Sequence, residues 1–491
     1  MIKYISTRDS SHKVSSSQAI LKGQAPDGGL YVPEDLEKIR VDYREIIKQD
    51  FRGIARSVWN VFFPDYGEEL IAELVEKSYA GKFSSPDITP LAKVGKDYVL
   101  ELYHGPTSAF KDVALSALPN LLTAARDMNG FTDEIMILTA TSGDTGSAAL
   151  CGFSDVPGTR IVVFYPHGGV SETQRLQMVT APGSNTSACA IHGNFDDAQT
   201  GVKKLFREIP QPVPGVSLSS ANSINIGRLV PQIVYYFSAY SQLVNAGAIA
   251  DGDKLDFVVP TGNFGDIMAG YFALKMGLPV GRLVCASNKN DVLTEFLDTG
   301  HYNRKRPFHK TTSPSMDILV SSNLERLLYY VCGEEHTVRY MKELSETGEY
   351  TITPDELKEI REVFSGACAS DEEGAAAIRD VFEAHHYLMD THTSIAWACM
   401  CSDKELSGTA SVVLSTASPY KFSRAVLSAL GAEISESDEV NMNRCREITG
   451  APIPEGLAGI FSREILHKDV ISADEMKDFV ISKSVIEKNN N

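Results

Sequence analysis

The chain has 491 residues, of which 43% are hydrophobic and 22% are charged. This length is more than one compact core can hold, so two or three domains are expected. The formal net charge of −18 creates a field that repels nucleic acid and anionic lipid, so we expect neither as a partner. A phosphorylated small molecule would have to be bound by a local cluster of cations.

The sequence also argues against several special environments. No run of eighteen apolar residues is present, so no transmembrane helix is expected, and the first residues lack the apolar stretch of a secretory signal. The eight cysteines are scattered and form no CxxC pair, which predicts neither a zinc site nor a structural disulfide. We therefore expect a cytoplasmic protein with reduced cysteines and no bound metal.

The predicted elements change in character along the chain. Residues 1–90 carry helical patterns, such as residues 67–79, and end in a stretch rich in Ser and Pro. Beyond it, short apolar runs predict strands at residues 98–103, 135–141, 160–165, 255–260, 282–286 and 411–415. Helical patterns such as residues 267–275 lie between them, so we predict an α/β fold with mostly parallel strands covered by helices.

Three regions follow from these patterns. We predict a small N-terminal domain at residues 1–90, a larger α/β region of two subdomains at residues 91–491, and within it an acidic, mainly helical insertion at about residues 325–383. Ligands of parallel sheets bind at the carboxyl ends of the strands. Motifs that directly follow predicted strands are therefore the candidates for function.

The first motif reads HGPTSAFKD and follows the predicted strand at residues 98–103, with Lys111 near the start of the next helix. The positive end of a helix disfavours an ammonium group and lowers its pKa. This suits a lysine that acts as a neutral amine nucleophile. The alternative is a solvated surface lysine beside Asp112.

Two Gly-rich loops follow other predicted strands. Backbone N–H groups at a helix start could bind a carboxylate in the loop made of Ser142, Gly143, Asp144 and Thr145. A phosphate would suit the loop made of Gly262, Asn263, Phe264, Gly265 and Asp266. The second loop matches neither GxGxxG nor GxxxxGK[ST], so neither a dinucleotide nor ATP is implied. Each loop could instead be a capped turn without a ligand, with Asp266 as a capping carboxylate.

The fourth motif reads LSTASPYKF and covers residues 414–422. A predicted strand ends here in the hydroxyls of Ser415 and Thr416, and Lys421 follows. The backbone could satisfy both hydroxyls, and Lys421 could be an exposed residue of the following helix.

Together the four motifs resemble the threonine synthase family, whose members are fold-type II enzymes that use pyridoxal 5′-phosphate (PLP). The likeness covers nearly the whole chain and includes APDGGLYVP at residues 25–33, GVS at residues 169–171, and NSIN at residues 222–225 before Arg228. It implies that Lys111 binds PLP covalently and that Thr416 faces the pyridine nitrogen. It also implies that the SGDTG loop binds the substrate carboxylate and that the loop of Gly262 to Asp266 holds the PLP phosphate.

The resemblance implies the conversion of O-phospho-L-homoserine and water to L-threonine and phosphate by elimination and replacement. For the substrate phosphate we propose Lys421 and Arg175, although Arg175 could also be an ordinary surface residue. Two alternatives stay open, namely a PLP lyase similar to serine or threonine dehydratase, and a PLP-binding protein without turnover. The sequence leaves the oligomeric state open.

Two stretches depart from the family pattern. Where the family has TAHPAKF, this chain has Ser418 and Tyr420 in place of His and Ala, and where the family has DPHT, it has Thr391 in place of Pro. Both stretches lie near the expected active site. They bear on substrate preference rather than on the fold or the cofactor.

Overall fold

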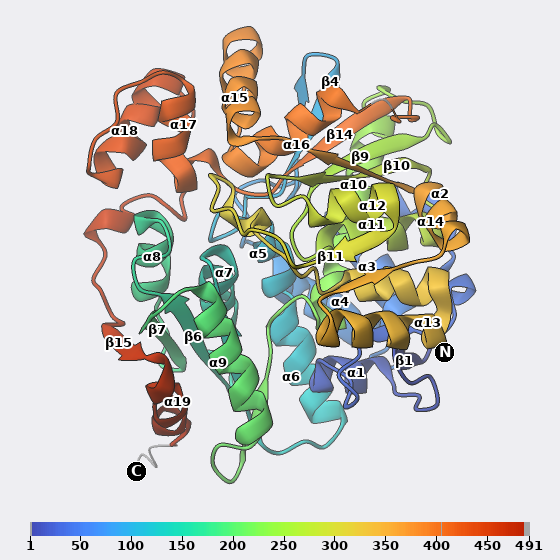
Figure 1. Cartoon of the computed structure of the whole chain (residues 1–491), viewed down its shortest axis with the longest axis vertical. Helices are drawn as coiled ribbons and strands as arrows, with labels where there is room; N and C mark the ends of the chain where they lie inside the picture. Colours follow the sequence, from blue (N-terminus) through green and yellow to red (C-terminus); the bar gives the residue numbers. More distant parts are fainter. Residues whose placement is uncertain (1, 404, 486–491) are drawn as a thin grey trace.

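Two large β-sheets organise the chain, and helices cover both of them (Figure 1). The described residues also form two small sheets of two strands each. The computed structural model describes residues 2–403 and 405–485. Among these residues, no helix has both the length and the apolar character that crossing a membrane requires.

The larger sheet has six strands in the order β13-β10-β9-β14-β4-β3. Neighbouring strands are parallel except for the antiparallel pair β3 and β4. Every residue of β9 is buried, as expected for a central parallel strand with both faces covered. The strand bounds are β3 Leu91–Val94, β4 Asp97–Glu101, β9 Leu255–Pro260, β10 Val280–Ser287, β13 Phe364–Cys368 and β14 Ala410–Ser415.

The smaller sheet has five strands in the order β15-β7-β6-β5-β8, all parallel. Its centre is a run of buried apolar side chains on β5 and β6, which explains why both strands are visible in the sequence. The strand bounds are β5 Glu134–Ala140, β6 Thr159–Pro166, β7 Thr186–His192, β8 Val216–Ser219 and β15 Asp469–Ser472.

Helices pack on both sheets and between them. The smaller sheet is contacted by α7 Asp144–Phe153, α9 Phe195–Glu208 and α19 Met476–Ser484, and the larger one by α11 Gly265–Met276, α12 Val292–Thr299 and α16 Thr391–Ser402. The remaining helices of this region are α5 Lys111–Leu115, α6 Leu118–Met128, α8 Glu172–Val179, α10 Ile226–Asn245, α17 Ser423–Ala429 and α18 Asp438–Thr449.

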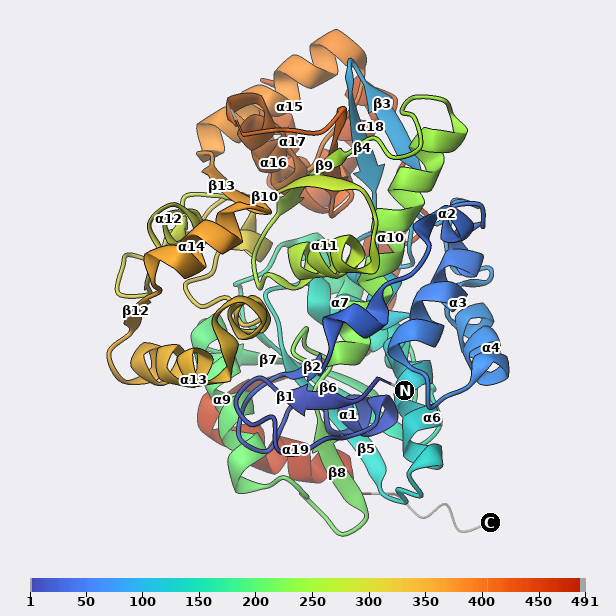
Figure 2. The same ribbon diagram turned by 90° about the vertical axis from the view of Figure 1, so that its right-hand side faces the viewer.

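The N-terminal residues pack along α10 and α6, where α3 runs beside α10 (Figure 2). The Tyr4 hydroxyl donates to the Phe62 carbonyl at 2.8 Å, which joins the first strand to the end of α3. The elements are β1 Tyr4–Ser6, α1 Ser16–Lys22, β2 Tyr31–Pro33, α2 Tyr43–Ile46, α3 Phe51–Phe62 and α4 Glu68–Tyr79.

The segment at residues 325–383, which the sequence predicts as a mainly helical insertion, consists mostly of helices but also contains two strands. Besides its helices it contributes β13, which pairs in parallel with β10 and forms an edge of the larger sheet. Its elements are α13 Leu324–Glu346, β12 Glu349–Thr351, α14 Pro354–Arg361, β13 and α15 Asp371–His385, and β12 pairs with β11 His301–Asn303. The proposed domain boundaries stay a prediction.

The α/β fold and its six predicted strands are confirmed. Each predicted run lies on β4, β5, β6, β9, β10 or β14, with ends shifted by at most a few residues, and residues 67–79 and 267–275 form α4 and α11. Of the strands in these two sheets, the predicted list lacks β3, β7, β8, β13 and β15. Two of these, β8 and β15, are short strands at a sheet edge with partly exposed residues, so hydrophobicity alone does not mark them.

Candidate active site

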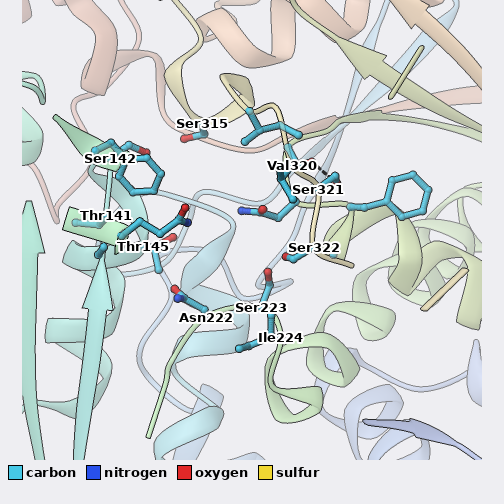
Figure 3. A pocket seen from close by; sticks show the side chains of 18 of the residues that line it. Thr141, Ser142, Thr145, Asn222, Ser223, Ile224, Ser315, Val320, Ser321 and Ser322 are labelled. Carbon is cyan, nitrogen blue, oxygen red and sulfur yellow. Dashed lines mark hydrogen bonds between the residues drawn. The ribbon is translucent and has the colours of Figure 1, made fainter. Parts of the chain in front are cut away.

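A cavity of about 1250 Å³ lies between the two sheets and collects most of the sequence motifs. Residues at or just beyond the carboxyl ends of β5, β6, β8, β9 and β14 line it. Figure 3 shows Thr141, Ser142 and Thr145 on one side, facing Ser321 and Ser322 across the cavity. The cavity therefore lies at the carboxyl ends of the strands, where the sequence predicts that ligands bind.

Lys111 lies at the cavity wall as the first residue of α5. The turn before it is fixed by the buried Asp112, whose carboxylate accepts hydrogen bonds from the N–H and the hydroxyl of Thr107. Phe110 and the loop beyond β14 are tied together, because the Phe110 N–H donates to the Thr416 carbonyl at 2.8 Å. Lys111 and Thr416 are thus held on neighbouring parts of the wall.

The Lys111 ammonium is disfavoured, but mainly for a different reason from the one predicted. Burial lowers its pKa from 10.5 to about 8, with a further lowering by Arg228 and Lys421 and an opposing effect of Asp144. The Lys111 Nζ lies 3.8 Å from the Asp144 Oδ2. Because α5 has only five residues, its macrodipole is weak, and desolvation dominates the shift.

Asp144 is the anion that connects two lysines. Its Oδ1 lies 2.8 Å from the Lys421 Nζ and accepts a hydrogen bond from the Gln174 Nε2 at 2.9 Å. Although burial alone would raise the pKa of Asp144, the two lysines and Gln174 hold it well below its usual range. Lys421 is fully buried and also donates to the Thr107 carbonyl at 2.9 Å, so it is not a solvated lysine.

The SGDTG loop begins α7 beside this ion pair. The Thr141 hydroxyl accepts hydrogen bonds from the N–H groups of Gly143 and Gly146, at 2.9 and 3.0 Å. Those two N–H groups are therefore already used. A ligand at this helix start would meet the N–H groups of Asp144 and Thr145, which bond to no other described residue.

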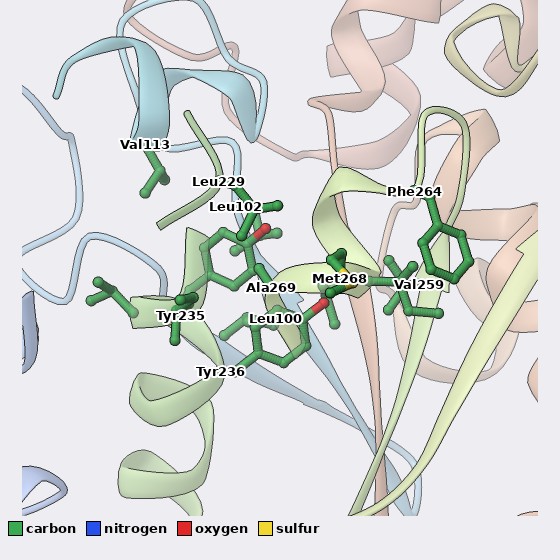
Figure 4. Packing of buried hydrophobic residues seen from close by; sticks show 14 of the residues in the cluster. Leu100, Leu102, Val113, Leu229, Tyr235, Tyr236, Val259, Phe264, Met268 and Ala269 are labelled. Carbon is green, nitrogen blue, oxygen red and sulfur yellow. The ribbon is translucent and has the colours of Figure 1, made fainter. Parts of the chain in front are cut away.

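The loop from Gly262 to Asp266 begins α11 and lines the cavity with all five of its residues. A Cβ on Gly262 would lie 2.5 Å from the Ser315 carbonyl oxygen, so only glycine fits there. Phe264 has a left-handed backbone, with φ of 60°, and its ring is buried in the core beside Val259 (Figure 4). The loop thus turns its backbone toward the cavity and its one large side chain away from it.

Asp266 does not cap α11. Its Oδ1 accepts hydrogen bonds from the hydroxyls of Tyr235, at 2.5 Å, and Tyr236, at 3.0 Å, while its buried Oδ2 has no partner among the described residues. Burial raises the pKa of Asp266 to about 6. The Asp266 carboxyl therefore stays mostly ionised at neutral pH but takes up a proton more readily than an exposed aspartate, and a nearby phosphate would raise its pKa further.

Several predicted site residues point elsewhere. Arg175 makes a two-fold contact with Glu172 at 2.7 Å and does not line the cavity. The departing residues Ser418, Tyr420 and Thr391 do not line it either. Tyr420 bonds to the Ala451 carbonyl, and Thr391 donates to the Thr312 carbonyl at 2.7 Å. Arg175 and Lys421 as phosphate ligands stay a prediction.

Two residues of the cavity wall have no assigned role in the sequence. His392 is buried between Asp390, 2.8 Å from its Nδ1, and the Ser315 N–H, 3.2 Å from its Nε2. Arg228 lies in the first turn of α10. One feature of the sequence could have identified Arg228 as a site residue. It is a cation in the first turn of an apolar helix, where the helix dipole favours an anion instead.

Comparison with known protein families matches three consecutive parts of the chain. Residues 3–79 match the family described as threonine synthase N terminus, residues 88–355 match pyridoxal-phosphate dependent enzyme, and residues 393–480 match threonine synthase, C-terminal.

Individual proteins give the same assignment. The threonine synthase of Schizosaccharomyces pombe is 37% identical over 88% of this chain and 90% of that protein. Threonine synthase-like 1 of Homo sapiens is 35% identical over 90% of this chain, which spans 62% of that longer protein. A crystal structure of PLP-bound threonine synthase from Brucella melitensis superposes with a TM-score of 0.88 at 36% identity, covering 99% of this chain and 100% of that one.

Proposed function

Because this chain belongs to the threonine synthase family, we propose that it converts O-phospho-L-homoserine and water into L-threonine and phosphate, with PLP as its cofactor. The observation that carries the proposal is the buried Lys111 amine. Its pKa is lowered to about 8, and it shares one cavity with a Gly-rich loop and the SGDTG loop. A reactive amine, a phosphate cradle and a carboxylate site are the parts that this reaction requires.

The residues of the cavity fit PLP. Lys111 would bind it covalently, the loop from Gly262 to Asp266 would hold its phosphate, and Thr416 would face its pyridine nitrogen. The space beside Gly262, which a Cβ would fill, and the partnerless Oδ2 of Asp266 support the cradle. When bound, PLP supplies the electron sink for negative charge that develops at Cα.

Lys111 is also the proposed acid and base. As a free amine it can take the protons from Cα and Cβ of the substrate while phosphate leaves from Cγ. It can then return protons at Cα and Cγ, while water adds at Cβ. A pKa of about 8 lets the amine exchange protons near neutral pH. Asp144, with its Oδ2 at 3.8 Å from the amine, stabilises the protonated form.

The carboxylate and the phosphate of the substrate each have proposed partners among the residues predicted from the sequence. Ser142, Gly143, Asp144 and Thr145 would receive the carboxylate, mainly through the free N–H groups of Asp144 and Thr145. For the phosphate, Lys421 and Arg175 remain our candidates from the sequence. Each would first have to leave its present carboxylate, Asp144 or Glu172.

We further propose that the enzyme works in the cytoplasm. The eight cysteines are all free thiols, which suits a reducing compartment.

The proposal is tested with purified protein by two measurements. Visible absorbance reports PLP, and borohydride reduction followed by peptide mapping should find the adduct on Lys111. Incubation with O-phospho-L-homoserine should release phosphate and form threonine in equal amounts. Deamination of serine or threonine without phosphate release would point to a dehydratase, and absorbance without any turnover would point to a binding protein.

A further inference from the structure

The loop from Gly262 to Asp266 contains an unfavourable backbone conformation. Phe264 has φ of 60° and ψ of 5°, which is the left-handed region that residues with a side chain rarely adopt. Such a conformation persists only where neighbouring groups fix it. The groups that hold the peptides before Phe264 therefore decide which way the N–H groups of the loop point.

Asn323 holds the peptide that joins Asn263 to Phe264. The Asn263 carbonyl accepts two hydrogen bonds from Asn323, one from its backbone N–H at 3.0 Å and one from its Nδ2 at 2.9 Å. The preceding peptide is held in a similar way, because the Ser321 hydroxyl donates to the Gly262 carbonyl at 2.8 Å. The C=O and N–H of a trans peptide point in opposite directions. The N–H groups of Asn263 and Phe264 therefore point away from Ser321 and Asn323.

These two N–H groups are available to a ligand. They bond to no other residue that the structure describes, and both Asn263 and Phe264 line the cavity. Successive N–H groups on one side of a loop form a concave site for an anion. Asn323 does not line the cavity, so it can affect a ligand only through the loop.

The direction of the Asn323 amide is fixed by its neighbours. A guanidinium can only donate a hydrogen bond and a carbonyl can only accept one. The Arg326 Nη1 donates to the Asn323 Oδ1, so the Nδ2 faces the Asn263 carbonyl. The same Nδ2 also donates to the Ser223 hydroxyl at 3.0 Å. Arg326 is fully buried, and its Nε donates to the Tyr31 carbonyl of β2 at 3.2 Å, so it is held in place from the N-terminal domain.

We propose that Asn323 is a positioning residue for the cofactor, because it fixes the Asn263–Phe264 peptide so that the Phe264 N–H faces the PLP phosphate. The proposal rests on the proposed function in one respect, namely that this loop holds the phosphate. Without the Nδ2 donor the peptide is freer to rotate, and a rotated peptide would turn the Asn263 carbonyl oxygen toward the phosphate. Asn323 therefore contributes to binding of the phosphate and not to binding of the pyridine ring.

The test separates the phosphate from the rest of the cofactor. Full-length wild type and Asn323→Ser are loaded with PLP or with pyridoxal, which lacks the phosphate, and equilibrium dialysis followed by visible absorbance measures both affinities. Serine keeps the preference for a helix start, but it is too short to reach the Asn263 carbonyl. The matched control is Asn441→Ser in α18. Asn441 is equally buried, its Nδ2 also donates to a backbone carbonyl at 2.9 Å, and it lies outside the cavity.

Asn323→Ser should lower the affinity for PLP by about three- to tenfold and leave the affinity for pyridoxal unchanged. The ³¹P resonance of bound PLP should shift, because the phosphate loses a fixed donor. Asn441→Ser should keep the wild-type ratio of the two affinities and the wild-type resonance. Equal losses for PLP and pyridoxal in Asn323→Ser would show a purely structural residue, and a wild-type affinity for PLP would overturn the proposal directly.

A second variant keeps the test decisive if Asn323→Ser does not fold. Asn323→Asp retains the size of the side chain and its contact with Arg326 but replaces the donor by an acceptor. The same selective loss for PLP is expected, with Asn441→Asp as the control. An unchanged ratio of PLP to pyridoxal affinity would again overturn the proposal.

Failure of the proposed function shows up separately. If the loop does not hold the phosphate at all, Gly262→Ala, which changes the loop itself, also keeps the wild-type ratio of the two affinities. If the loop holds the phosphate without help from Asn323, only the Asn323 variants keep that ratio. Turnover plays no part in these measurements, so a wild type that releases no phosphate from O-phospho-L-homoserine would refute the proposed reaction and leave the result for Asn323 standing.

Discussion

Lys111 has a pKa lowered from 10.5 to about 8, and burial is the main cause. Only the neutral amine can attack the PLP aldehyde, so we expect the rate of covalent PLP attachment to rise with pH up to about 8 and then level off. Stopped-flow absorbance over a pH series measures this rate. A rate that keeps rising toward pH 10.5, as for an exposed lysine, would contradict the structure.

Lys421 offers a second test at the residue scale. As predicted from the sequence, Lys421→Ala should lower kcat/KM for O-phospho-L-homoserine by about ten- to a hundredfold, because a charge-assisted hydrogen bond contributes roughly 1.5–3 kcal/mol. The ion pair with Asp144 adds an expectation. Removing Lys421 takes a repelling cation from Lys111 and leaves Asp144 to act on it alone, so the pKa of Lys111 should rise.

Substrates with and without a phosphate group distinguish the two possible roles of Lys421. If Lys421 binds the substrate phosphate, its removal should affect the kinetics of phosphorylated substrates only. If Lys421 acts as a partner of Asp144, its removal should shift the pH profile of PLP attachment and weaken the binding of unphosphorylated amino acids as well. Unchanged kinetics and an unchanged pH profile would leave Lys421 with neither role.

The single residues show what the sequence can and cannot predict. The place of Lys111 and of the five residues from Gly262 to Asp266 at the cavity wall was predictable because each motif is contiguous and follows a strand. Their roles stay a prediction. The Lys421–Asp144 pair and the buried position of Arg228 at the cavity wall were not predictable, because they depend on which distant side chains meet after folding. The predicted cause of the lowered Lys111 pKa, the helix dipole, was also wrong. Burial is the main cause, and burial cannot be read from a local sequence pattern.

At the scale of elements, the Gly-rich loop before α11 depends on close contact with a neighbouring segment. A Cβ on Gly262 would lie 2.5 Å from the backbone oxygen of Ser315, whereas one on Gly265 would lie 3.3 Å from the side-chain nitrogen of Asn323. Gly262→Ala must therefore displace backbone, at a cost of about 1–3 kcal/mol. We expect this substitution to lower the affinity for PLP by about tenfold or more.

The matched variant for this loop is Gly265→Ala, which should lower the affinity for PLP less, because only a side chain has to move. PLP titration by absorbance and thermal unfolding of the PLP-free protein separate loss of the cradle from loss of the fold. Equal PLP affinity for Gly262→Ala and the wild type would show that the Ser315 segment does not shape the cradle. By the same reasoning, Gly265→Val, which adds two more carbons, should lower the affinity for PLP more than it lowers the stability of the PLP-free protein.

The elements that the sequence predicted share strong local signals. Long buried runs such as β5 and β9 are apolar throughout, and α11 follows directly from its strand and loop. In contrast, β13 lies in a stretch of mainly helical pattern and becomes a strand by pairing with β10. Similarly, β15 pairs with β7 from far along the chain, and such pairing is decided by tertiary contacts rather than by propensity.

At the scale of the whole molecule, the charge of the cavity differs in sign from that of the protein. The net charge is −18, yet the described residues that line the cavity include eight Lys and Arg side chains and only four Asp and Glu side chains. Two of the cations, Lys203 and Arg207, lie one turn apart on the exposed face of α9. The protein therefore repels a phosphorylated substrate at long range and attracts it near the cavity.

This arrangement predicts how capture of the substrate depends on salt. At low ionic strength, Lys203→Glu combined with Arg207→Glu should lower kcat/KM for O-phospho-L-homoserine by about three- to tenfold, because focused fields in clefts raise association rates. At about 0.5 M salt the Debye length falls to roughly 4 Å, and the difference from the wild type should mostly disappear. Lys358→Glu combined with Arg379→Glu, on α14 and α15 and outside the cavity, changes the net charge by the same amount and should have little effect. A deficit that persists at high salt would mean that Lys203 and Arg207 contact the substrate directly, and equal kinetics at low salt would mean that they do not guide it at all.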